Sequence, residues 1–197
     1  MIIFHDPHCV EYSAPGHPER AARITRTVPL LKERHPKWTW REPRAPTEKE
    51  LLRAHSREHI SEVKNPAGDF DLDTPAYPKI DTYARQTAGA GIETARTALK
   101  GERAFALMRP PGHHATRDQA MGFCYFNNIA VAALDALENG ADRVAIWDFD
   151  AHHGMHFSGD TEPLTRYLFS HDRADLIAAS VATFAFGCVL LHRLISI

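Results

Sequence analysis

The sequence has few cysteines and no excess of charge of either sign. Cys9, Cys124 and Cys188 are the only three cysteines among 197 residues, and they are widely spaced with no Cys-x-x-Cys pair. This pattern excludes a disulfide framework and a cysteine-based zinc site, and it is typical of a reducing cytoplasm. The formal net charge is -2 at pH 7, so no basic field favours nucleic acid or an anionic membrane. We therefore expect a cytoplasmic protein that binds neither.

The sequence also lacks a clear targeting or membrane-spanning segment. The first ten residues, MIIFHDPHCV, have no basic stretch followed by a long apolar run, and they predict a strand instead of a signal peptide. The most apolar stretch, residues 176–197, contains Ser and Thr in its first half and His and Arg in its second. We expect a helix followed by a buried strand there, and a membrane anchor is the alternative.

Short apolar runs alternate with longer amphipathic ones, which predicts an α/β fold with a parallel sheet flanked by helices. The whole chain, residues 1–197, is expected to form a single domain. The expected helices cover residues 17–35, 47–64, 81–101 and 127–140, and the expected strands cover residues 1–5, 103–108 and 143–150. Thr47 and Glu50 have the spacing of a capping box, and residues 65–79 are rich in Pro, Gly and Asp, which predicts a long loop.

Carboxylates and an imidazole alternate in the segment WDFDAHHG, residues 147–154. On an extended backbone, Asp148, Asp150 and His152 point to one face. Such mixed oxygen and nitrogen ligands suit a divalent metal, zinc above all, with Asp150 and His152 as ligands and Asp148 orienting a neighbouring imidazole. The alternative is that these carboxylates only cap the turn after the strand.

Two adjacent histidines, His113 and His114, follow the rigid segment Arg-Pro-Pro-Gly at residues 109–112. Two prolines fix the backbone and a glycine permits an unusual dihedral, so this turn can hold both imidazoles in one orientation for acid and base chemistry. Two surface histidines in a loop are the alternative. Both histidine segments directly follow a strand, and the carboxyl ends of parallel strands are where ligands collect.

Two long segments resemble the signature segments of the histone deacetylase superfamily, which includes the acetylpolyamine amidohydrolases. They are RPPGHHATRDQAMGFCYFNNIAVAA, residues 109–133, and RVAIWDFDAHHG, residues 143–154. HPERAAR at 17–23 and LLRAHSREHI at 51–60 are similar to that family's N-terminal region. The likeness covers residues 1–154 and implies an arginase/deacetylase-like fold, with a divergent or shortened part at 155–197.

The resemblance also implies a role for each matching residue. His113 and His114 would be the histidine pair beside the water that zinc activates, with His114 as general base. Asp148 would polarise His113 and lie near a structural monovalent cation such as K⁺. Asp150 and His152 would be two of three zinc ligands.

The same resemblance implies the substrate and the reaction. Phe123, with Gly122 before it, would line a narrow channel for an acetylated lysine or an acetylated polyamine. The reaction would be hydrolysis of an acetyl amide to acetate and a free amine.

The likeness to the family fails after Gly154. The family's third zinc ligand, an Asp, and its oxyanion-binding Tyr, in a Gly-Gly-Tyr turn, come from a later region, and this sequence contains no Gly-Gly-Tyr. Asp160 is the nearest carboxylate for the third ligand, and His153 and His156 are alternatives. We therefore expect an impaired deacetylase, and the competing interpretation is a non-catalytic deacetylase-like protein that keeps the pocket or a homo-oligomer surface.

Overall fold

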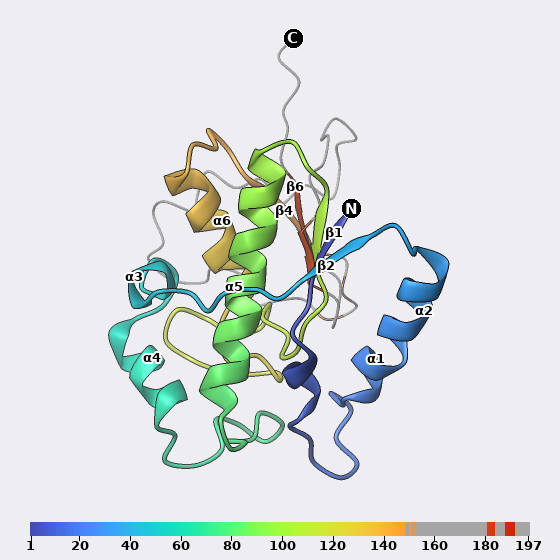
Figure 1. Cartoon of the computed structure of the whole chain (residues 1–197). Helices are drawn as coiled ribbons and strands as arrows, with labels where there is room; N and C mark the ends of the chain where they lie inside the picture. Colours follow the sequence, from blue (N-terminus) through green and yellow to red (C-terminus); the bar gives the residue numbers. More distant parts are fainter. Residues whose placement is uncertain (149, 151, 153–180, 184–187, 192–197) are drawn as a thin grey trace.

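The computed structural model describes residues 1–148, 150, 152, 181–183 and 188–191. Six short strands form one sheet within these residues. The strands are β1 (Ile2–Phe4), β2 (Thr39–Arg41), β3 (Ala104–Ala106), β4 (Ala145–Asp148), β5 (Val181–Thr183) and β6 (Cys188–Leu191). Their order across the sheet is β2-β1-β3-β5-β6-β4 (Figure 1).

The sheet is parallel except at β6. β1 pairs in parallel with both β2 and β3, and β3 pairs in parallel with β5. β6 is antiparallel to both of its neighbours, β5 and β4, so β4 runs in the same direction as the first three strands. The expected parallel sheet is confirmed for these strands, whereas the antiparallel β6 was not predicted.

The apolar stretch at 176–197 differs from its prediction in one part. β6 confirms a strand in the second half, but β5 lies in the half for which a helix was expected. β5 has the sequence Val-Ala-Thr, and its Thr183 pairs with Ala106 of β3. Two of its three residues, Val181 and Thr183, are β-branched, and β-branched residues favour strands over helices.

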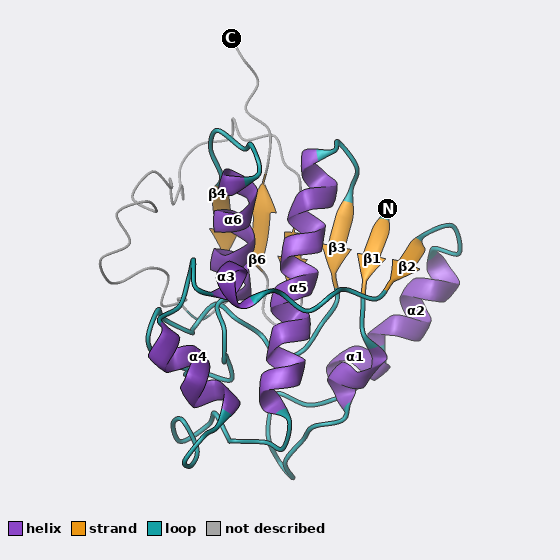
Figure 2. Ribbon diagram, turned by 60° about the vertical axis from the view of Figure 1, so that its left-hand side comes forward, coloured by secondary structure: helices purple, strands orange, loops and turns teal. Residues whose placement is uncertain are grey.

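Helices pack against the sheet and extend beyond its β2 edge. Their bounds are η1 (Pro7–Val10), α1 (Ala22–Thr25), α2 (Thr27–Arg34), α3 (Glu48–Leu51), α4 (Arg57–Lys64), α5 (Ile80–Leu99) and α6 (Asn128–Glu138). α5 and α6 lie side by side against one face of the sheet (Figure 2). A Cβ at Gly91 of α5 would be 3.0 Å from the carbonyl oxygen of Asn128, so a small residue is needed where the two helices touch. None of the described helices is long and apolar enough to cross a membrane.

The expected helix over 17–35 begins only at Ala22 and is divided into α1 and α2. Residues 17–21 are used in tertiary contacts instead. The Glu19 carboxylate binds the buried Arg109 guanidinium, and His17 Nε2 donates to the Asp73 carbonyl oxygen at 3.0 Å. These longer-range contacts override the local helical pattern.

The expected helix over 47–64 is likewise two helices, α3 and α4. The capping box of Thr47 and Glu50 is confirmed at the start of α3. A second N-cap, Ser56, begins α4 by accepting a hydrogen bond from the His59 amide. Between the helices His55 is fully buried, and its Nε2 accepts from the Asn127 amide at 2.9 Å. The break in the helix therefore allows His55 to reach Asn127, in the segment that follows His113 and His114.

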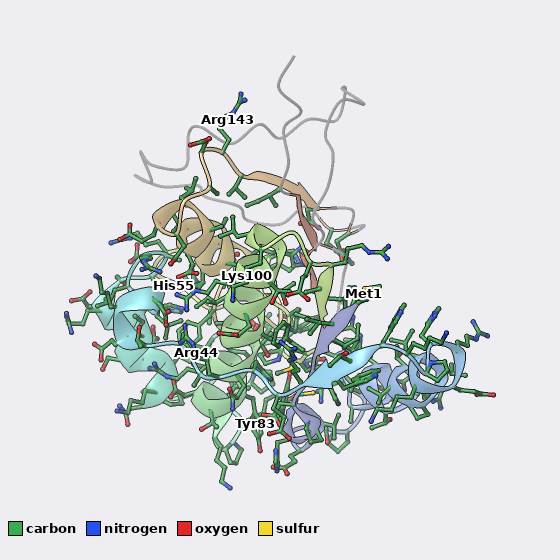
Figure 3. All side chains as sticks on the ribbon, turned by 45° about the horizontal axis from the view of Figure 1, so that its top comes forward. Met1, Arg44, His55, Tyr83, Lys100 and Arg143 are labelled. Carbon is green, nitrogen blue, oxygen red and sulfur yellow. The ribbon has the colours of Figure 1, made fainter. Side chains whose placement is uncertain are left out.

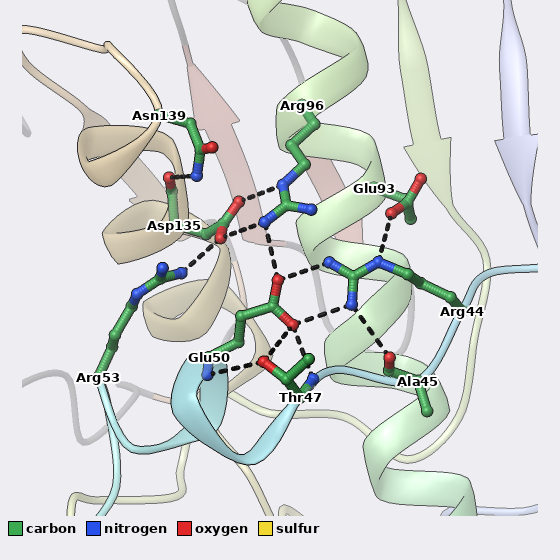
Figure 4. A network of polar contacts seen from close by, with 9 residues as sticks. All are labelled: Arg44, Ala45, Thr47, Glu50, Arg53, Glu93, Arg96, Asp135 and Asn139. Atoms are coloured by element: carbon green, nitrogen blue, oxygen red, sulfur yellow. Dashed lines mark hydrogen bonds and ion pairs between the residues drawn. The ribbon is translucent and has the colours of Figure 1, made fainter.

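A network of charged side chains joins α3, α5 and α6 (Figure 4). Arg44 and Arg96 both donate to the Glu50 carboxylate, and Arg96 and Arg53 both donate to Asp135. Asp135 is fully buried, and hydrogen bonds from Arg44 hold the pKa of the Glu50 carboxyl well below its usual range. Because each buried carboxylate has two guanidinium partners, neither is left as an unpaired buried charge.

The segment before α3 crosses α5 in direct contact with its backbone. A Cβ at Gly89 would be 1.9 Å from the carbonyl oxygen of Arg44. Only glycine permits this approach, which places Arg44 beside the charged network. Figure 3 shows side chains crowded between the helices and the sheet, whereas the exposed Arg143 extends away from the loop before β4.

The first prediction concerns acid stability. Burial lowers the pKa of His55 to about 3, with a further contribution from His59. Because this folded-state pKa is below the unfolded value of about 6.5, the unfolded chain takes up the proton first. The stability that neutral His55 contributes is therefore full above pH 6.5 and is lost as the pH falls below it.

We expect His55→Gln, whose amide can accept and donate the same hydrogen bonds, to lose less stability between pH 6.5 and 4 than the wild type. Urea unfolding at several pH values measures this difference. His8→Gln is the control, because His8 is exposed and its pKa is raised by Asp6. Equal acid sensitivity of the wild type and His55→Gln would contradict the assignment.

Candidate active site at the carboxyl ends of the strands

A fully buried arginine anchors the loop that follows β3. Arg109 Nε and Nη2 donate to the two carboxylate oxygens of Glu19 at 2.6 and 2.7 Å. The same guanidinium donates to the carbonyl oxygens of Cys9 and Tyr12, and it lies 4.1 Å from the centre of the Tyr12 ring. A planar, bidentate group of this kind satisfies several buried acceptors at once. Arg109 therefore fixes the base of the histidine loop to the N-terminal segment.

The other end of the loop is fixed by two asparagines. Asn127 caps α6 by accepting from the Ala130 amide, and its Nδ2 donates to the carbonyl oxygen of Ala115. A Cβ at Gly112 would be 2.6 Å from the Asn128 backbone nitrogen, so the loop approaches the start of α6 closely. The glycine in Arg-Pro-Pro-Gly is needed for this contact.

The structure brings His113, His114 and Asp148 together. His113 is 3% exposed, and its Nδ1 lies 2.9 Å from Asp148 Oδ2. A carboxylate only accepts, so His113 Nδ1 carries the hydrogen, which fixes the orientation of the ring. The ring centroids of His113 and His114 are 4.0 Å apart. The residues at the ends of β3 and β4 thus meet, as the sequence predicted.

His114 is partly buried and lies beside two other histidines, His113 and His152. Burial is the largest cause that lowers the pKa of its imidazole, to about 4; His113 and His152 act in the same direction, and Asp150 and Asp148 oppose it. His114 is therefore a neutral imidazole near pH 7. A neutral imidazole can accept a proton, which a charged one cannot.

Asp150 and His152, the two zinc ligands that the resemblance implies, lie in contact. His152 Nδ1 lies 3.2 Å from Asp150 Oδ1, and the other carboxylate oxygen, Oδ2, is buried without a partner among the described residues. His152 remains 71% exposed, whereas the Asp150 side chain is buried. A buried carboxylate oxygen without a donor is the atom that a cation would satisfy, so the donor set fits zinc.

The chain contains a second Asp-x-His pair, Asp6 and His8, which shows what such a pair looks like when the aspartate only caps a turn. Asp6 Oδ1 accepts from the His8 amide at 2.9 Å and lies 2.7 Å from His8 Nδ1. Asp150 caps the His152 amide in the same way at 2.8 Å, so the capping interpretation is also satisfied by this geometry. The two pairs differ in the buried Asp150 Oδ2, which has no described donor. Capping alone does not account for that atom.

The third ligand is not found in the part of the chain that the structure describes. No group of three His, Cys, Asp or Glu side chains there could enclose a metal ion. Asp160 and its alternatives His153 and His156 lie outside the described residues. Asp150 and His152 are therefore the only candidate ligands from this motif that lie among the described residues.

Phe123 and Gly122 form a turn that packs on the second histidine. Both have positive φ values, 69° and 56°. A Cβ at Gly122 would be 2.6 Å from His114 Cδ2, so the turn lies directly against the imidazole. Phe123 is partly buried and lies edge-on to the His17 ring at 4.9 Å.

The sequence reasoning did not identify the residues that support this arrangement. Glu19 falls within the helix that the sequence predicts over 17–35. Asp71 and Thr74, which contact the 122–123 turn, fall within the predicted loop. The one available signal was an arginine within an apolar strand end, because a charge in such a place needs a buried partner. The position of that partner, 90 residues away in sequence, could not be deduced.

Comparison with known proteins identifies the family. Residues 17–158 match the histone deacetylase domain. A probable deacetylase of Methanothermobacter thermautotrophicus is 36% identical over 159 residues, which cover 78% of this chain and 48% of that protein. The human polyamine deacetylase HDAC10 is 33% identical over 187 residues, covering 87% of this chain and 26% of that protein.

A solved structure agrees with this assignment. The crystal structure of the HDA15 HD domain has a TM-score of 0.71 and 35% identity, covering 78% of this chain and 48% of that one. The chain belongs to the histone deacetylase family. It spans about half the length of the first curated relatives it matches.

The second prediction concerns the buried ion pair. Glu19→Gln leaves the Arg109 charge buried without its carboxylate, and it should lower the free energy of unfolding by about 3–5 kcal/mol. Glu48→Gln removes the same group from the exposed pair of Glu48 and Arg57, and it should cost at most about 1 kcal/mol. Urea denaturation of both variants makes the comparison. Equal losses would show that Arg109 does not depend on Glu19.

Proposed function

We propose that this protein is a zinc-dependent amidohydrolase that removes acetyl groups from acetyl-lysine or acetylated polyamines. The observation that carries the proposal is the contact of His113 with Asp148 at 2.9 Å, with His114 beside it and the Asp150–His152 pair next in the chain. Family membership and the name of the human polyamine deacetylase support the same chemistry.

Asp150 and His152 would hold the metal. When bound, zinc would supply a Lewis acid that polarises the acetyl carbonyl and lowers the pKa of water.

His113 and His114 would carry out the proton transfers of the reaction. His114, neutral because its pKa is low, would take a proton from the attacking water. The hydroxyl oxygen adds to the acetyl carbon, the carbon–nitrogen bond breaks, and the amine leaves with a proton from the histidine pair. His113, held by Asp148, would keep its ring oriented and stabilise positive charge as the proton moves. Acetate and a free amine are the products.

Phe123 would form part of the wall beside the acyl chain. Its ring is partly buried and is carried by the turn that packs on His114. An aromatic wall next to the histidine pair suits the apolar methylene chain of a lysine or polyamine better than a large polar group.

We also propose that this chain by itself hydrolyses acetylated amines slowly. The described residues supply two metal ligands, and the sequence contains no Gly-Gly-Tyr turn to donate a hydrogen bond to the oxyanion. Loss of one oxyanion donor typically slows catalysis by about 100- to 1,000-fold. The same observation favours the second candidate, a deacetylase-like protein that binds acetylated amines without turning them over.

The third prediction is therefore a rate. With added zinc, the full chain should hydrolyse an acetyl-lysine peptide or acetylputrescine at least about 100-fold more slowly than the Methanothermobacter relative. Any residual activity should disappear in His114→Ala and persist in His35→Ala, because His35 stacks on Trp38 and has no contact with the site. Acetate release measures both rates.

Two outcomes would contradict this account. Turnover at the relative's rate would show that the chain supplies its own third ligand and oxyanion donor. Residual turnover that survives in His114→Ala would remove His114 from the proposed role of base.

A further inference from the structure

The turn that carries Phe123 has a backbone conformation that its sequence does not favour. Met121 and Cys124 exchange two backbone hydrogen bonds of 3.0 Å, with Gly122 and Phe123 between them. Both central residues have positive φ, as in a type I′ turn. Glycine adopts this conformation freely, but for a bulky residue it is an outlier that persists only when surrounding contacts impose it. Something outside the turn must therefore hold Phe123.

A second turn, residues 71–74, supplies those contacts. Thr74 Oγ1 accepts from the Phe123 amide at 2.9 Å, and Asp71 Oδ2 accepts from the Gly122 amide at 3.1 Å. Thr74 is fully buried. Both amides at the centre of the Phe123 turn are thus bound by side chains from one loop.

The 71–74 turn is itself held in place. Asp71 Oδ1 accepts from the Asp73 amide at 3.0 Å, and the Phe70 amide donates to the Thr74 carbonyl oxygen at 3.0 Å. His17 Nε2 donates to the Asp73 carbonyl oxygen at 3.0 Å while its ring packs edge-on against Phe123. The loop is therefore a fixed support for the Phe123 turn.

The support extends to the histidine pair through Gly122. Because a Cβ there would meet His114 Cδ2, Cγ and Cβ at 2.6–3.0 Å, any shift of the turn changes the space beside the His114 ring. One loop thus determines both the position of the aromatic wall and the room available to the imidazole.

We propose that Thr74 and Asp71 are positioning residues for the deacetylase site, holding Phe123 in its left-handed conformation and the Gly122 turn against His114. This inference rests on the proposed function for its consequence in substrate binding. The support itself is a property of the described residues.

The experiment compares Thr74→Val, which keeps the shape and removes the acceptor, with Thr74→Ser, which restores it. In the full chain with zinc, Thr74→Val should weaken binding of an acetyl-lysine peptide by about tenfold, as expected for loss of one hydrogen bond. It should also shift the His114 ring resonances and speed amide exchange at Phe123. Thr74→Ser should restore all three, and Asp71→Ala should weaken binding in the same direction.

A matched control separates positioning from general loss of stability. Thr94 is also fully buried, but its hydroxyl donates within α5 to the Ala90 carbonyl oxygen. Thr94→Val should lower stability without changing peptide affinity, the His114 signals or Phe123 exchange. Wild-type affinity and unmoved His114 signals in Thr74→Val would overturn the positioning role.

The readouts also separate failure of this inference from failure of the proposed function. If the wild type binds no acetylated amine, the proposed function fails. The His114 resonances and Phe123 exchange in Thr74→Val and Thr74→Ser then still decide whether Thr74 positions the turn.

Discussion

The bidentate contact of Arg109 with Glu19 is the constraint on which the histidine loop depends. Taking two charges out of water is costly, and only the paired geometry, with further carbonyl acceptors from Cys9 and Tyr12, offsets that cost. Because this guanidinium binds Glu19, Cys9 and Tyr12 at once, it joins the N-terminal segment to the loop after β3. This connection places His113 and His114 near Asp148 at the end of β4.

Besides the Arg109–Glu19 pair, buried carboxylates have different partners in three other places. In the network of α3, α5 and α6, two carboxylates share several guanidinium groups, which joins helices without leaving an unpaired charge. At His113, one carboxylate orients one imidazole. At Asp150, a buried oxygen has no described donor, and a cation is the partner that its chemistry suits. Only the last arrangement is left incomplete by the described residues, and it is the one next to the histidine pair.

Much of the site could be predicted from the sequence because its residues are close together in the chain. Asp148 ends β4, Asp150 and His152 follow it directly, and His113 and His114 are adjacent, so the rule for parallel strand ends places them at one edge of the sheet. The capping box of Thr47 and Glu50 was predictable for the same reason. What could not be predicted depends on distant partners: the late start of α1 follows from the contact of Glu19 with Arg109, and the break before α4 follows from the burial of His55. The reversed direction of β6 also depends on sheet pairing that no local pattern encodes.

The most direct test of the account is the zinc affinity of the Asp150–His152 pair, measured by calorimetric titration of the full chain. Asp150→Ala and His152→Ala should each abolish binding, because either change removes one of the two proposed ligands. His8→Ala should leave the affinity unchanged, since the Asp6–His8 pair has the same spacing and a similar contact but both residues lie outside the site. Zinc binding that survives in Asp150→Ala, or that is lost in His8→Ala, would contradict the account, because the metal would then lie elsewhere in the chain.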